Sequence, residues 1–78
     1  MDTIRFGKIL KELRLENELG QVALSNALRC SHGIISEWES GKKTPSADTL
    51  INIAKFFDVT TDYLLGLEDE FGSKLKDT

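Results

Sequence analysis

Apolar side chains recur along most of the chain at the three- and four-residue spacing of amphipathic helices. In the first segment, Phe6, Ile9, Leu10 and Leu13 form one stripe, and charged residues occupy the opposite side. Thr3 is the expected N-cap, and the pattern stops near residue 17. The first segment therefore predicts an amphipathic helix that buries its apolar side.

Two shorter apolar repeats follow within residues 20–40. The first carries Leu24, Ala27 and Leu28 at positions i, i+3 and i+4, and the second carries Ile35 and Trp38 three residues apart. Each repeat predicts a helix of about eight residues with one apolar face. Two helices joined by a turn of three or four residues cross steeply, so the second one projects its outer face into solvent.

Capping residues place the ends of the second of these helices. Ser31 is the expected N-cap and Gly41 the expected stop, so the helix is predicted over residues 31–40. Cys30, just before it, is expected to pack as a small apolar residue between the two helices. A redox-sensing role for this thiol is the alternative.

Two further helices are predicted in the second half of the chain. Ser46, after Pro45, is the expected N-cap of one, Thr60 is the expected N-cap of the other, and Gly66 ends the latter. The apolar stripe of the first consists of Leu50, Ile53, Ala54 and Phe57, widened by Ile51 and Phe56. Five short helices with short loops predict a compact all-α domain over residues 1–67.

Residues 68–78 form a polar tail for which we expect no fixed structure. Leu67, Phe71 and Leu75 recur every four residues, so a short sixth helix against a partner subunit is the alternative. Gly72 and Ser73 weaken that alternative because both are poor helix formers.

The charge is unevenly distributed. The chain has 78 residues, enough for one domain, and a net charge of −3. Residues 1–47 hold seven basic and six acidic side chains, whereas residues 48–78 hold three basic and seven acidic ones. The acidic excess therefore lies away from the two central helices, and we expect weak non-specific DNA affinity that depends on salt.

Several classes of protein are disfavoured. No apolar run approaches the ~20 residues of a membrane span, and the N-terminus lacks the apolar core of a signal peptide. One cysteine cannot form an internal disulfide, so we expect a cytoplasmic protein. Cys30 and His32 are too few for a metal site, and no phosphate loop or nucleophile–base pair occurs. We expect no enzymatic activity, no cofactor and no small-molecule ligand.

Residues 4–67 resemble the Cro/cI phage-repressor family, the XRE-like helix-turn-helix regulators. The matching residues are Leu19, Gln21, Leu24, Leu28, Ser31, Ile35, Trp38, Glu39, Ser40, Gly41, Lys42, Lys43, Thr44, Pro45, Ser46, Thr49, Leu50, Ala54, Asp62, Tyr63, Leu64, Leu65 and Gly66. The resemblance implies a five-helix lambda-repressor-like domain and a sequence-specific, double-stranded-DNA-binding transcriptional regulator, repressor-like in action. Gly20 and Arg29 depart from the family pattern, which has a hydroxyl N-cap and a turn glycine there.

The resemblance also implies which residues meet the bases. With residues 31–40 in the major groove, the base-contacting residues are Ser31, His32, Gly33, Ser36 and Glu37. Glu37 can only accept hydrogen bonds, which suits cytosine N4, whereas His32 is expected to donate to guanine N7 or O6, or to phosphate.

Phosphate contacts are implied on both sides of this helix, from Gln21, Arg14, Lys42, Lys43 and Thr44. Arg14 also matches one half of a family salt bridge to Glu39, so its role is expected to be partly structural. Gln21 stands at a helix N-terminus, where free N–H groups favour an anion.

One domain of this size buries too little surface for tight specific binding, so a homodimer on a pseudo-palindromic operator is expected. The candidate interface residues are Tyr63, Leu64 and Leu67. The alternative is that Tyr63 and Leu64 complete the core of the monomer.

A second function stays open at this point. The predicted recognition helix carries no Arg, Gln or Asn for the common bidentate base contacts, and Glu37 repels phosphate. A protein-interaction module with the same fold, such as an antitoxin or an anti-repressor, is the alternative.

Overall fold

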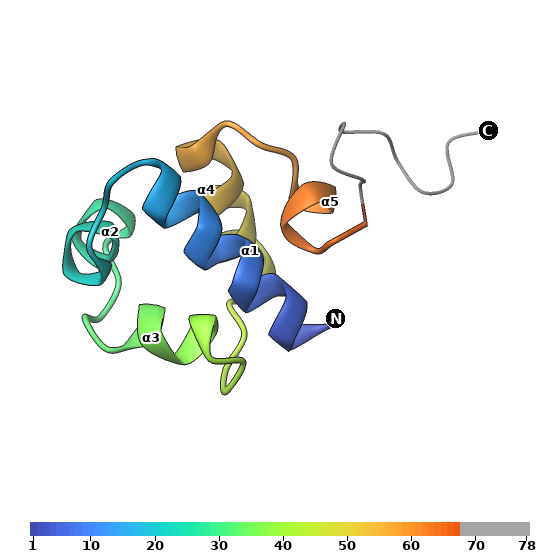
Figure 1. Ribbon diagram of the computed structural model, residues 1–78, viewed down its shortest axis with the longest axis horizontal. Coiled ribbons are helices and arrows are strands. Elements are labelled where there is room, and N and C mark those ends of the chain that lie inside the picture. Colours follow the sequence, from blue (N-terminus) through green and yellow to red (C-terminus); the bar gives the residue numbers. More distant parts are fainter. Residues whose placement is uncertain (68–78) are drawn as a thin grey trace.

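The computed structural model describes residues 1–67 and contains five α-helices and no strand within that range (Figure 1). The helices are α1 (Thr3–Glu16), α2 (Gln21–Leu28), α3 (Ile34–Glu39), α4 (Ala47–Phe57) and α5 (Thr61–Leu64). This confirms the all-α five-helix fold. The predicted tail, with Phe71 and Leu75, lies outside the described residues.

One apolar core joins all five helices. Helix α1 packs on α3 and α5, α2 packs on α3 and α4, and α4 packs on α5. The buried apolar residues are Phe6, Leu10, Leu13, Leu24, Ile35, Trp38, Ile53, Ala54 and Leu64. Because each short helix contributes only one to three of them, the helices depend on one another for stability.

A glycine sets the distance between α1 and α3. Gly7 is buried, and a Cβ atom at this position would lie 2.6 Å from the backbone oxygens of both Trp38 and Glu39. Any larger residue would push the end of α3 away from α1. The close contact of the two helices therefore requires glycine, although periodicity alone gives no sign of it.

The helix starts follow capping chemistry, with one correction. Ser46 and Thr60 cap α4 and α5 as predicted, and each side chain accepts a hydrogen bond from the backbone N–H three residues further on. At α1, however, Asp2 is the N-cap and Thr3 is already helical. Asp is an equally good cap, and it stands one residue earlier.

Residues in the left-handed backbone conformation end several helices. Arg29 ends α2 with φ 57°, and Asp58 ends α4 with the same φ. Such a conformation in a non-glycine residue costs about 1 kcal/mol. Gly66 has φ 77° after α5, where glycine carries no such cost.

Helix α3 is shorter than predicted. It begins at Ile34, and residues 32 and 33 form a turn before it. Gly33 is the N-cap and has no side chain to accept a hydrogen bond, while the Ser31 carbonyl accepts from the Ile34 N–H at 3.2 Å. Ser31 is therefore not the N-cap that was predicted.

The buried faces of α2 and α4 also differ from the predicted stripes. Ala27 is exposed on α2, and Ser25 is fully buried beside Leu24. The Ser25 hydroxyl donates to the Val22 carbonyl at 2.7 Å, which satisfies it in the core.

On α4, Ile51 and Phe56 are 44% and 43% exposed, so they do not widen the core as predicted. Helix α4 contacts its neighbours along one side only, and Ile51 and Phe56 lie outside that side. Within residues 1–67, no helix is both long and apolar enough to cross a membrane.

Candidate nucleic-acid interface

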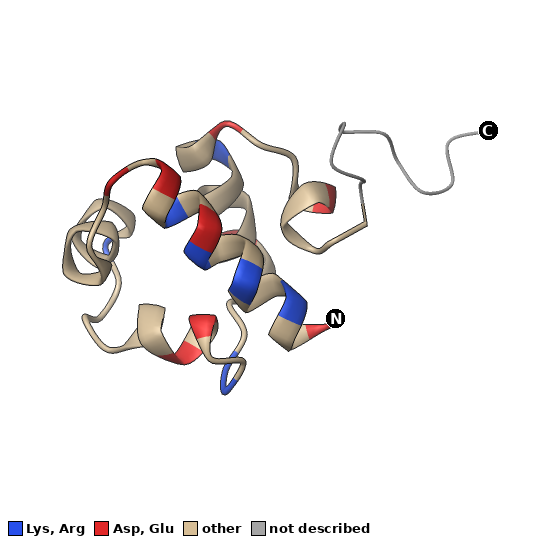
Figure 2. Ribbon diagram, in the orientation of Figure 1, with Lys and Arg blue, Asp and Glu red and all other residues tan. Residues whose placement is uncertain are grey.

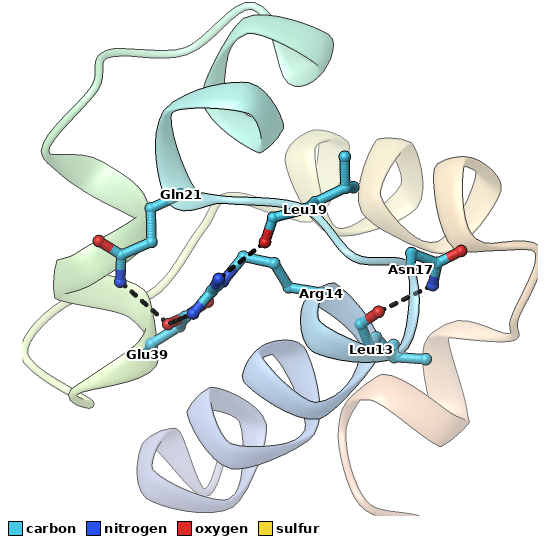
Figure 3. Close-up of polar contacts among 6 residues, drawn as sticks. All are labelled: Leu13, Arg14, Asn17, Leu19, Gln21 and Glu39. Carbon is cyan, nitrogen blue, oxygen red and sulfur yellow. Dashed lines mark hydrogen bonds and ion pairs between the residues drawn. The ribbon is translucent and has the colours of Figure 1, made fainter.

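A buried ion pair joins α1 to the end of α3 (Figure 3). Arg14 Nε donates to Glu39 Oε2 at 2.6 Å, and Arg14 Nη2 donates to Glu39 Oε1 at 3.1 Å. The two side chains are only 9% and 6% exposed. Two parallel hydrogen bonds between a guanidinium and a carboxylate fix both position and orientation.

The same pair extends to the start of α2. Arg14 Nη1 donates to the Leu19 carbonyl at 2.8 Å, and Gln21 Nε2 donates to Glu39 Oε1 at 3.1 Å. The pKa of Arg14 is raised, chiefly by its hydrogen bonds to Glu39 and also by the attraction of that carboxylate, against the opposing effect of burial. Arg14 is therefore a fixed cation that connects three helices.

This burial agrees with the structural part of the role expected for Arg14. Arg14 is 7% exposed, and its guanidinium donates to Glu39 on α3 and to the Leu19 carbonyl. A phosphate contact by Arg14 stays a prediction. Gln21, also expected at a phosphate, is half-buried and shares Glu39 with Arg14.

The C-terminal end of α3 is fixed by its own backbone. Gly41 has φ 81°, its N–H donates to the Trp38 carbonyl at 3.2 Å, and the Lys42 N–H donates to the Glu37 carbonyl at 2.9 Å. This pair of bonds is a Schellman motif, and it turns the chain sharply after the helix. Gly41 thus ends α3 as predicted and presents the loop that carries the lysines.

The five predicted base-contacting residues all remain accessible, but they belong to two elements. Ser31, His32 and Gly33 lie in the turn before α3, and all three are exposed. Ser36 is exposed and Glu37 is partly exposed on α3 itself. All five stay accessible to solvent, whereas Ile35 and Trp38 of the same segment are buried in the core.

Two of these residues already have side-chain partners. His32 Nε2 lies 3.1 Å from Asn26 Oδ1, on α2. Glu37 Oε1 lies 3.5 Å from Lys43 Nζ, in an ion pair that is 38% and 61% exposed at the two side chains. The lysine lowers the repulsion that a lone Glu37 would exert on a phosphate chain.

Cations flank this surface. Lys42, Lys43 and Thr44 are exposed in the loop after α3. Figure 2 shows this basic loop and a second set of Lys and Arg along α1. The acidic residues of α4 and α5 do not belong to the loop after α3, which agrees with the uneven charge of the sequence.

A small polar hollow of about 250 Å³ lies between the helices beside this surface. Its lining residues are Lys11, Gln21, Ser36, Glu39 and Ser40. From the sequence pattern, Lys11 belongs only to the charged side of the first predicted helix. The sequence feature that points to its position is the three-residue spacing between Lys11 and Arg14, which puts both residues on one side of α1.

The candidate dimer residues do not share one environment. Leu64 is fully buried within the chain, so it belongs to the core and not to a free surface, as the alternative interpretation held. Tyr63 is half-buried against the same core. Leu67 is 47% exposed and is the only one of the three that presents a largely free apolar surface.

Cys30 packs partly against the core, and its thiol lies 3.7 Å from the Ser25 carbonyl. Burial raises the pKa of the Cys30 thiol, which disfavours the reactive thiolate. Among residues 1–67, no group of three or more His, Cys, Asp or Glu side chains is placed to hold a metal ion.

Helices α2 and α3, the tight turn between them, and the helices that hold them define a helix-turn-helix domain. The helix-turn-helix domain family matches residues 7–70, and the chain belongs to this family, in its XRE-like branch. Domains of this kind occur in DNA-binding transcriptional regulators.

Two curated relatives are similar over most of the chain. The HTH-type transcriptional activator BcrR of Enterococcus faecalis is 42% identical over 66 residues, which are 85% of this chain and 32% of BcrR. The HTH-type transcriptional regulator ImmR of Bacillus subtilis (strain 168) is 35% identical over 68 residues, which are 87% of this chain and 53% of ImmR. The chain thus spans between a third and about half of the length of these relatives.

Two solved structures share the fold. The restriction-modification controller protein C.AhdI from Aeromonas hydrophila superposes with a TM-score of 0.74 at 25% identity, covering 81% of this chain and 96% of that one. The DNA-binding domain of BldD superposes with a TM-score of 0.70 at 18% identity, covering 81% and 92%. Both place the present chain in the same five-helix fold.

Proposed function

We propose that the chain is a sequence-specific DNA-binding transcriptional regulator that places residues 31–40 in the major groove. The observation that carries this proposal is the buried Arg14–Glu39 pair, which fixes α3 while Ser36 stays exposed and Glu37 partly exposed on the same helix. The major groove admits a helix and displays a distinct donor and acceptor pattern for each base pair. Ser31, His32, Gly33, Ser36 and Glu37 would meet the bases there.

Phosphate contacts would come from the loop after α3 and from the start of α2. Lys42, Lys43 and Thr44 are exposed beside the recognition surface, and Gln21 stands at the N-terminus of α2. Lys11, on the rim of the polar hollow, joins this set. Such contacts fix register without carrying sequence information, which is left to the exposed side of α3.

We infer a homodimer on a pseudo-palindromic operator, because a single domain of this size buries too little surface for tight binding. With Leu64 in the core, exposed Leu67 and half-buried Tyr63 remain as interface candidates. An operator that overlaps a promoter suffices for repression, so repression is the simplest mode for this domain. BcrR, whose name describes an activator, is a longer protein.

The first test is selection of bound duplexes from a random pool at about 0.1 M salt, with the folded state of the protein confirmed by circular dichroism. An enriched two-fold symmetric motif is the expected result. If a folded protein enriches nothing, the DNA-binding proposal fails and the protein-interaction alternative replaces it.

Two matched variants separate base contact from phosphate contact. Glu37→Gln adds a donor, so preference should move from cytosine towards adenine at one position, by roughly 5- to 150-fold for a bidentate contact. Lys42→Ala should weaken all sequences alike and reduce the salt slope by about 0.9. Equal effects of both variants on every sequence would contradict the assignment of Glu37 to a base.

A further inference from the structure

We call the five candidate base-contacting residues, Ser31, His32, Gly33, Ser36 and Glu37, the recognition surface. Its balance of hydrogen-bond donors and acceptors depends first on the contact between His32 and Asn26. His32 Nε2 lies 3.1 Å from the side-chain oxygen of Asn26, and both residues are exposed. Asn26 belongs to α2, whereas His32 lies in the turn before α3, so the contact spans the two halves of the motif.

This contact favours one of the two tautomers of the His32 ring. With the Asn26 oxygen facing Nε2, the tautomer that satisfies the contact carries its hydrogen on Nε2, because an amide oxygen can only accept a hydrogen bond. In a neutral imidazole the other nitrogen is then a bare acceptor. His32 Nδ1 is thus left to accept a hydrogen bond from a base, which is opposite to the donor role expected from sequence.

Glu37 has the same polarity. Its carboxylate can only accept, and Lys43 Nζ, 3.5 Å away, partly compensates its negative charge. Gly33, between these two residues along the chain, has no side chain that could donate. The side-chain donors left on this surface are the hydroxyls of Ser31 and Ser36, and a hydroxyl accepts equally well.

We propose that this surface recognises base edges that carry amino groups, namely cytosine N4 and adenine N6, and that Asn26 is the positioning residue that sets this preference at His32. The inference rests on the proposed DNA-binding function and deepens it. Guanine presents only N7 and O6 acceptors in the major groove, so it has no partner for His32 Nδ1 or Glu37. The half-site is therefore rich in cytosine and adenine at the contacted positions.

The first experiment measures the His32 tautomer in the free, ¹⁵N-labelled full chain. His32 is the single histidine of the sequence, so its ring nitrogens are identified without ambiguity. At about pH 8.5, where imidazole side chains are neutral, the long-range ¹H–¹⁵N pattern should show the proton on Nε2. Asn26→Leu removes the acceptor and should shift the pattern towards a mixture. A proton on Nδ1, or identical patterns in both proteins, would overturn the proposal.

The second experiment measures base preference with the selected motif. The His32 position is the one at which His32→Ala removes discrimination. There, the native chain should prefer an amino-bearing base over guanine by at least about fivefold, the lower end for one good base contact. Asn26→Leu should reduce that ratio to less than half, and Asn26→Gln, which keeps an uncharged accepting oxygen, should retain more of it than Asn26→Leu. Asn52→Leu, an exposed asparagine on α4, is the matched control and should change nothing.

These outcomes separate the two proposals. Failure of the folded chain to enrich any motif would overturn the DNA-binding function together with this inference. A motif with guanine at the His32 position, or an Asn26→Leu protein with unchanged preference, would overturn the inference alone and leave the DNA-binding function standing.

Discussion

The Arg14–Glu39 pair allows a sharp test of how α3 is held in place. Glu39→Gln keeps the size and one accepting oxygen of the side chain but removes its charge. The Arg14 cation then stays in a site that is 9% exposed, without the carboxylate that compensates it at 2.6 Å. The hydrogen bond from Gln21 to Glu39 Oε1 is put at risk by the same change.

The expected cost is large because only one partner is removed. Breaking a buried ion pair in this way costs about 3–5 kcal/mol, and the oxygen retained by Gln favours the lower end. A chain of this length has a total free energy of unfolding of roughly 4–12 kcal/mol. The substitution therefore removes a substantial part of the stability of the domain.

Urea unfolding followed by circular dichroism measures this cost. With a slope near 1 kcal/mol/M, the midpoint should fall by about 3 M. Glu37→Gln is the matched control: the same substitution two residues earlier, in an ion pair with Lys43 whose side chains are 38% and 61% exposed, should cost less than about 0.5 kcal/mol. A double variant, Arg14→Met with Glu39→Leu, should stay within about 1 kcal/mol of the native chain because no charge is left unpaired.

The pH dependence follows from the raised pKa of Arg14. A raised pKa means that the folded state holds the proton more tightly, so this stabilisation is complete below the ordinary arginine range and is lost only above it. The difference between native chain and Glu39→Gln should therefore be constant from about pH 6 to pH 10. If Glu39→Gln lowers the free energy of unfolding no more than Glu37→Gln does, the argument that the Arg14–Glu39 pair fixes α3 is refuted.

Two further predictions concern buried positions. Gly7→Ala should lower the free energy of unfolding in urea by about 1–3 kcal/mol, although alanine favours helix, because its Cβ would meet the backbone oxygens of Trp38 and Glu39 at 2.6 Å. Gly33→Ala is the control, because a Cβ there meets nothing within 4 Å. Equal losses of stability in the two variants would contradict this explanation. The raised pKa of the Cys30 thiol predicts slower alkylation at about pH 8 in the folded than in the urea-unfolded chain. The same shift predicts a stability that declines as pH rises through the ordinary thiol range, since only the unfolded thiol then ionises; equal alkylation rates would show that the thiol is not protected.

Local sequence signals determined most of the secondary structure. The stripe of Phe6, Leu10 and Leu13 is buried in α1, and Ser46 and Thr60 cap their helices because a side-chain oxygen can bond to an N–H only three residues away. These interactions lie within one helical turn, so a pattern in the sequence captures them completely.

Only the tertiary structure decided the roles that depend on packing between helices. The sequence predicts Arg14 at a phosphate and Leu64 at a dimer interface. In the structure both are buried, Arg14 through its hydrogen bonds to Glu39 and Leu19 and Leu64 within the apolar core. The contact of His32 with Asn26, six residues away on α2, appears only in the folded chain. Gly7 likewise matters only because the end of α3 lies against it. Local periodicity fixes which side of a helix is apolar, whereas burial and hydrogen-bond partners are set by which other helix lies there.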